Sequence, residues 1–92
     1  MLEHKPIKLP LDPSDEEILR YALISELDAV NTYEQLSQST DNKDLQIIIE
    51  DIIKEEKLHI GELQSFLIKL DEDQANQMIE GSNEVRLLTG ND

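Results

Sequence analysis

The feature that most constrains this chain is a Glu-x-x-His unit, Glu56-Lys57-Leu58-His59, in a stretch with helical periodicity from about residue 43 to residue 70. At about 100° per residue, positions three apart lie on one helix face. The apolar residues on this same face are Leu45, Ile48, Ile52, Leu63, Phe66 and Leu70. Burying a carboxylate and an imidazole without a partner costs free energy. A metal ion is the partner that would use both groups.

A second helix is predicted upstream, with a carboxylate in the centre of its own apolar face. The segment Asp12 to Glu17 contains a capping residue, a proline suited to a first helical turn and three acids that favour the positive end of the helix dipole. The helix should begin there and run to about Gln38. The apolar residues within about 60° of Glu26 on this helix are Leu19, Ala22, Leu23, Val30 and Tyr33.

The polar residues of the two helices are predicted to lie at the same height. Ser39 to Asn42 is the only plausible turn between them. Glu26 and Glu56 are both about 15 residues from this turn, which is roughly 20 Å at 1.5 Å rise per residue. A short connection favours an antiparallel hairpin, so Glu26, Glu56 and His59 should meet on one face. Glu55 competes with Glu56 for this role, and the Glu-x-x-His spacing favours Glu56.

Two carboxylates and one imidazole make up half of a di-iron carboxylate centre. In ferritin-like bundles such a centre takes a Glu from each of two helices and a Glu-x-x-His from each of the other two. The missing half would come from a second chain. The second helix supports this, because further apolar residues lie outside its main face and a hairpin alone cannot cover them. These residues are Ile47, Ile53, Leu58, Ile60 and Ile68.

The predicted fold class is therefore all-α: an antiparallel two-helix hairpin with a short C-terminal helix, dimerising into a ferritin-like four-helix bundle. Three regions are expected along the chain. Residues 1–12, with two prolines, should form an extended arm, and residues 13–80 the helical hairpin. The hairpin region includes a short third helix that Gly81 should end, and residues 81–92 should form a tail with a short helical turn.

Composition excludes several function classes. A formal net charge of -13 and a pI near 4.3 argue against nucleic acid or an anionic membrane as partner and favour cations. The absence of cysteine excludes disulfides and thiolate ligands, so a metal would be held by oxygen and nitrogen. No segment has the length of a membrane span, and the first ten residues lack the apolar core of a signal peptide. A cytoplasmic protein is expected.

The sequence resembles a known family at these residues. Ser25 to Gln35, followed by Glu55-Glu56-Lys57-Leu58-His59, is similar to the paired motifs of the encapsulated ferritins, which are short ferritin-like proteins housed in encapsulin nanocompartments. The final stretch from Asn83 to Gly90 is also similar to the end of that domain in archaeal members. The resemblance covers most of residues 13–90.

This resemblance implies a ferroxidase that binds two irons between two subunits and converts Fe(II) to Fe(III) with a dioxygen-derived oxidant. Other divalent metals can substitute. Glu26, Glu56 and His59 would be the iron ligands, with Tyr33 beside the centre. The implied assembly is a ring of dimers inside an encapsulin shell, to which it delivers iron for storage.

The resemblance also suggests where metal enters the centre. The family often has acids flanking the first ligand, and Ser25 and Asp28 occupy those positions here, so only Asp28 matches in chemistry. Glu55 and Glu62 are further candidates for metal entering the site. The simpler interpretation of Asp28, Glu34 and Glu62 is a solvated helix face, and that of Tyr33 is a core tyrosine.

Two alternatives stay open. One is a different di-iron enzyme of the ferritin-like class, an oxidase or a peroxidase, although the missing cysteines exclude an attached rubredoxin domain. The other is a non-enzymatic helical module that serves only for assembly. Oxidation of Fe(II) in air separates the second alternative from the enzymes.

Overall fold

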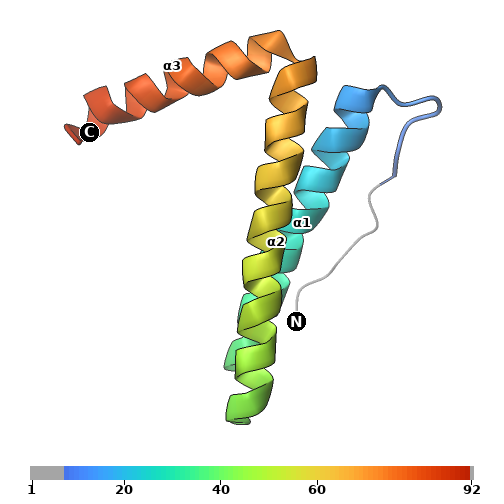
Figure 1. Ribbon diagram of the computed structural model, residues 1–92, viewed down its shortest axis with the longest axis vertical. Helices are drawn as coiled ribbons and strands as arrows, with labels where there is room; N and C mark the ends of the chain where they lie inside the picture. The colour runs from blue at the N-terminus through green and yellow to red at the C-terminus, as the bar shows by residue number, and fades with distance from the viewer. Residues whose placement is uncertain (1–7, 92) are drawn as a thin grey trace.

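The computed structural model describes residues 8–91, and within that range every regular element is a helix. The helices are α1 (Asp15–Gln38), α2 (Lys43–Leu70) and α3 (Glu72–Thr89). Figure 1 shows α1 and α2 side by side as an antiparallel hairpin, with α3 leaving the end of α2 at a steep angle. The all-α prediction is confirmed.

Side-chain caps fix where the first two helices begin. Ser14 and Glu17 form a reciprocal capping box, in which each backbone N–H donates to the other side chain at 3.1 Å. This box places the start of α1 at Asp15, slightly later than the predicted proline-led start, and leaves Asp12 outside the helix with a left-handed φ of 54°. Asn42 caps α2 by accepting the Leu45 N–H at 3.2 Å.

The turn between α1 and α2 is closed by one glutamine. The Gln46 side-chain amide donates to the carbonyl oxygens of Thr40 at 2.6 Å and Ser37 at 3.3 Å. The Ser37 carbonyl belongs to the last turn of α1, where backbone acceptors have no partner within the helix, and the Thr40 carbonyl lies in the turn that follows. Gln46 therefore holds the end of α1 against the start of α2.

The structure differs from the prediction at the C-terminal end. α3 continues through Gly81 and ends at Gly90, which has φ 70° and donates its N–H to the Arg86 carbonyl at 2.8 Å. Glycine inside a helix costs only about 1 kcal/mol relative to alanine, which does not by itself end a helix. Gly90 ends α3 because the cap there requires a left-handed residue.

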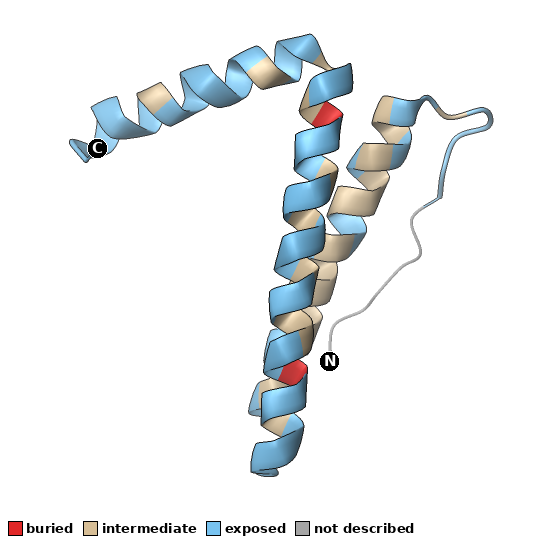
Figure 2. Cartoon of the chain, in the orientation of Figure 1, coloured by how far each residue is buried: buried red, intermediate tan, exposed pale blue. Residues whose placement is uncertain are grey.

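The core of the protomer is small. Only Ile49 and Leu67 are buried among the described residues, and both lie on α2 where it faces α1 (Figure 2). By helical projection this contact line is about 80° from His59, so the face centred on His59 is not the one that packs against α1, contrary to expectation. The reason is that α2 is apolar on more than one side. Large apolar residues that stay exposed on α2 are Leu45, Ile47, Ile48, Leu58, Phe66 and Leu70.

The predictions of an N-terminal arm and of three regions are tested only in part by the described residues. The arm predicted for residues 1–12 lies partly outside the described residues, and residues 8–14 form neither helix nor strand. The division into three regions stays a prediction. No helix in the described range combines the length and the apolar character needed to cross a membrane.

Candidate metal centre

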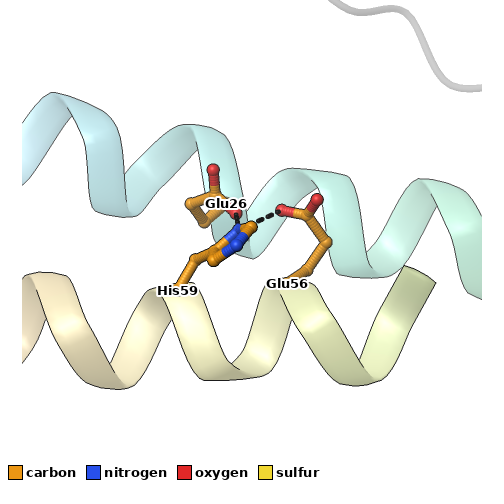
Figure 3. A group of neighbouring side chains, drawn as sticks. All are labelled: Glu26, Glu56 and His59. Carbon is orange, nitrogen blue, oxygen red and sulfur yellow. Dashed lines mark ion pairs between the residues drawn. The ribbon is translucent and has the colours of Figure 1, made fainter. Parts of the chain in front are cut away.

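Three side chains from α1 and α2 converge at mid-height of the hairpin. Glu26 comes from α1, and Glu56 and His59 come from successive turns of α2 (Figure 3). The Nδ1 atom of His59 lies 3.4 Å from Glu26 Oε2 and 3.8 Å from Glu56 Oε2. One donor atom from each residue lies within 4.8 Å of the other two. A single ion could contact all three side chains with small rotamer adjustments.

The two carboxylates are more enclosed than the imidazole. The relative side-chain exposures are 26% for Glu26, 19% for Glu56 and 47% for His59. Glu26 Oε2 is out of contact with solvent and has no hydrogen-bond partner within residues 8–91. In that range, neither carboxylate forms an ion pair with a lysine or arginine. A buried carboxylate oxygen without a partner is costly, and a cation in the space between the three residues would satisfy it.

The other residues predicted near the centre lie around this group. Glu55 and Glu62 are exposed on α2, outside the convergent set, so Glu56 is the acid that meets Glu26 and His59. Asp28 and Tyr33 are half-buried on α1. Tyr33 lies two turns beyond Glu26 on the same side of the helix, whereas Asp28 is rotated about 160° away by its position.

The donor set suits a hard or borderline ion. Carboxylate oxygen and imidazole nitrogen bind iron, zinc and manganese, and the chain has no thiolate to favour softer ions. Three ligands leave further coordination positions to be filled. His59 is the exposed member, and the same face of α2 carries exposed Leu45, Ile48, Phe66 and Leu70. The group therefore opens onto an apolar surface on which a second molecule could bring additional ligands.

Comparison with known proteins places this arrangement in a family. The family model described as Rubrerythrin matches residues 17–87, which include all three helices almost completely. The crystal structure of the encapsulated ferritin domain from Pyrococcus furiosus superimposes with a TM-score of 0.80 at 37% sequence identity. That match covers 98% of this chain and 97% of the domain. The chain belongs to the rubrerythrin family, and within it to the encapsulated ferritins.

Two curated relatives of this encapsulated ferritin are named for encapsulins. A ferritin-like-encapsulin shell fusion protein from Pyrococcus furiosus is 43% identical over 74 residues, which is 80% of this chain and 21% of the relative. An encapsulin nanocompartment cargo protein from Myxococcus xanthus is 31% identical over 84 residues, which is 88% of this chain and 65% of the relative. The chain thus spans about a fifth of the first relative and less than two thirds of the second.

Proposed function

We propose that this encapsulated ferritin is a ferroxidase, which oxidises Fe(II) to Fe(III) at a di-iron centre shared between two subunits. The observation that carries the proposal is the convergence of Glu26, Glu56 and His59, in which one buried carboxylate oxygen has no hydrogen-bond partner in the described structure. The family assignment adds independent support, because the matching crystal structure is itself named an encapsulated ferritin domain. Fe(II) is the substrate in this reaction.

Each protomer contributes half of the proposed centre. A second copy related by a twofold axis would bring its own Glu26, Glu56 and His59 to the open side of the group. Two protomers together would supply four carboxylates and two imidazoles, the ligand set of ferritin-like di-iron proteins. Four carboxylate charges balance two divalent ions, which lowers the cost of burying the acids.

The side chains have separate roles in this proposal. The carboxylates of Glu26 and Glu56 neutralise the metal charge and can change between terminal and bridging contact as the oxidation state rises. The neutral imidazole of His59 holds one side of each ion. Bound iron supplies one electron per ion to a dioxygen-derived acceptor. Tyr33, half-buried two turns from Glu26, is the candidate for a hydrogen bond near the centre. Asp28, Glu55 and Glu62 are the candidates for attracting the incoming cation, and each is an acid close in sequence to a proposed ligand.

The proposed destination of the iron follows from the relatives. A shell fusion protein and a nanocompartment cargo protein both match most of this chain. We infer that the chain works inside an encapsulin nanocompartment in the cytoplasm, with the encapsulin shell as its partner. There, a ring of dimers would pass Fe(III) to the lumen for storage. Co-expression with an encapsulin and isolation of loaded shells tests this part separately from the oxidation chemistry.

The ferroxidase assignment is tested by oxidation of Fe(II) in air, followed by the near-ultraviolet absorbance of Fe(III). Glu56→Gln removes one proposed ligand charge with little change in shape and should reduce the rate to the level without protein. Glu50→Gln is the matched control, because Glu50 is an exposed acid of the same helix outside the convergent group. It should keep most of the wild-type rate. A full rate in Glu56→Gln would contradict the assignment.

The same assay distinguishes the remaining candidates. A protein that binds iron but oxidises it no faster than buffer would be a helical assembly module. Fast consumption of hydrogen peroxide with slow reaction in air would indicate a peroxidase of the same structural class. X-ray anomalous scattering from crystals grown with Fe(II) would report how many ions bind and whether their ligands come from two chains.

A further inference from the structure

A single residue forms the elbow between α2 and α3. Asp71 ends α2, donating its backbone N–H to the Leu67 carbonyl at 2.8 Å, and also caps α3, accepting the Gln74 N–H through Oδ1 at 3.0 Å. Its backbone, with φ -116° and ψ 89°, belongs to neither helix. Because the two helices meet at one non-helical residue, rotation about its two dihedral angles would redirect all of α3.

The second carboxylate oxygen of Asp71 is bound from α1. Arg20 Nη2 donates to Asp71 Oδ2 at 2.9 Å, which joins residues 51 positions apart in the sequence. In the described part of the chain, no Cα atom of α1 lies within 8 Å of a Cα atom of α3. Beneath the elbow is a hollow of about 320 Å³, with lining residues that include Leu23 and Ile24 of α1, Leu67 of α2, and Met78 of α3. Close backbone packing against α1 therefore does not set the angle of α3.

The surroundings of Asp71 favour its charged form, as an ion pair with Arg20 requires. Two hydrogen bonds hold the pKa of the Asp71 carboxyl below its usual value. The bond from the Gln74 backbone N–H has the larger effect and the bond from the Arg20 side chain the smaller. The carboxylate is thus charged across the physiological pH range. Arg20 is half-exposed, so the pair is accessible to salt.

We propose that the Arg20–Asp71 pair is a clasp that sets the direction of α3 relative to the hairpin. Asp71 keeps one oxygen for the cap and one for Arg20, so the start of α3 and its angle are fixed by the same side chain. The direction of α3 decides where its exposed apolar residues are presented. These residues are Met78, Ile79, Val85, Leu87 and Leu88. The clasp acts on the shape of the subunit and is independent of iron oxidation.

The test measures the angle of α3 directly. The chain has no cysteine, so spin labels attach only to cysteines introduced for the purpose, at exposed Lys54 on α2 and exposed Glu84 on α3. An excess of unlabelled chain removes distances between subunits. Pulsed electron–electron double resonance should give a narrow distance distribution for the parent protein, in which the Arg20–Asp71 pair is intact. The distribution for Arg20→Gln should be broader and shifted. Asp71→Asn, which keeps an oxygen for the cap but loses the charge, should behave similarly.

Matched controls separate the clasp from a general effect of losing an arginine. Arg86→Gln removes an arginine whose side chain, within residues 8–91, donates only to Asn83 of its own helix, and this variant should leave the distribution unchanged. The Arg20→Gln/Asp71→Asn double variant should broaden no further than either single variant, because both remove one bond. Raising the salt to about 1 M screens exposed ion pairs and should broaden the parent distribution without any mutation. The proposal would be overturned if the distance distribution did not respond to salt and stayed unchanged in every clasp variant that folds. Equal broadening in Arg86→Gln would also overturn it.

Discussion

Glu26 has the one buried side-chain oxygen without a hydrogen-bond partner among the described residues. Its Oε2 atom is shielded from solvent without a hydrogen bond, and the Glu56 carboxylate and His59 imidazole are its nearest ionisable neighbours in the group. Two carboxylates this close repel one another unless a cation lies between them. Glu26 should therefore reduce the stability of the metal-free protein and increase the stability gained on binding metal.

Replacing Glu26 tests this trade-off. Glu26→Gln removes one of the two facing charges and should raise the unfolding free energy of the metal-free protein, by about 1 kcal/mol. The stabilisation that Fe(II) gives under anaerobic conditions should disappear in the same variant, because a neutral amide is a poor iron ligand. Thermal unfolding with and without Fe(II) measures both effects.

Glu50→Gln is the control, since Glu50 is an exposed acid of α2 outside the convergent group. It should leave both values close to those of the parent protein. A metal-free Glu26→Gln protein that is less stable than the parent would mean that Glu26 has a structural partner, and the metal assignment would lose its main support.

At the scale of the elements, the hairpin depends on how its single turn is closed. The register of α1 against α2 brings Glu26 level with Glu56 and His59. That register is fixed where the Gln46 amide binds the carbonyls of Thr40 and Ser37. Because only two residues are buried in the described chain, the alignment of the two helices depends strongly on these hydrogen bonds at the turn.

Gln46→Ala should destabilise the protein by about 1–2 kcal/mol, because two partly buried hydrogen bonds are lost and two carbonyls are left without their donor. Gln64→Ala is a matched control on the exposed surface of the same helix, and its side chain makes no hydrogen bond within the described residues. Urea unfolding of the two variants gives the comparison. Equal stability of the two variants would show that the turn does not depend on Gln46.

At the scale of the whole molecule, the protomer does not bury enough apolar surface to account for its sequence. Large apolar side chains stay exposed on all three helices while only two residues are buried in the described chain. A net charge of -13 opposes association of such surfaces at low salt. Cations that bind between acidic side chains would reverse this balance, so assembly and metal binding should be coupled.

Adding Fe(II) without oxygen should therefore shift the protein toward larger assemblies. The expected change is an increase in mass, measured by light scattering after size-exclusion chromatography, with the dimer as the smallest unit that completes the centre. His59→Ala should weaken the response, because each proposed ion then loses its imidazole ligand. A mass distribution that stays the same with and without Fe(II) would argue against a centre shared between subunits.

The local sequence determined the helices and placed the three candidate ligands at the same height along the hairpin. The end of α1 at Gln38 and both ends of α2 agree with the prediction, because caps and hydrophobic periodicity act over a few residues. The same spacing predicted that Glu26, Glu56 and His59 would meet, since rise per residue converts sequence distance from a turn directly into height. Family membership was also accessible from the paired motifs.

Only the tertiary structure decided the rotation of α2 and the direction of α3. α2 has apolar residues around most of its circumference, so its sequence could not indicate that Ile49 and Leu67, rather than the face centred on His59, would pack against α1. The competition between Glu55 and Glu56 was resolved by that same rotation. The angle of α3 depends on Arg20 and Asp71, which are 51 residues apart. Periodicity records interactions within one helix, whereas rotation and crossing angle depend on contacts between helices, and those are formed only when the chain has folded.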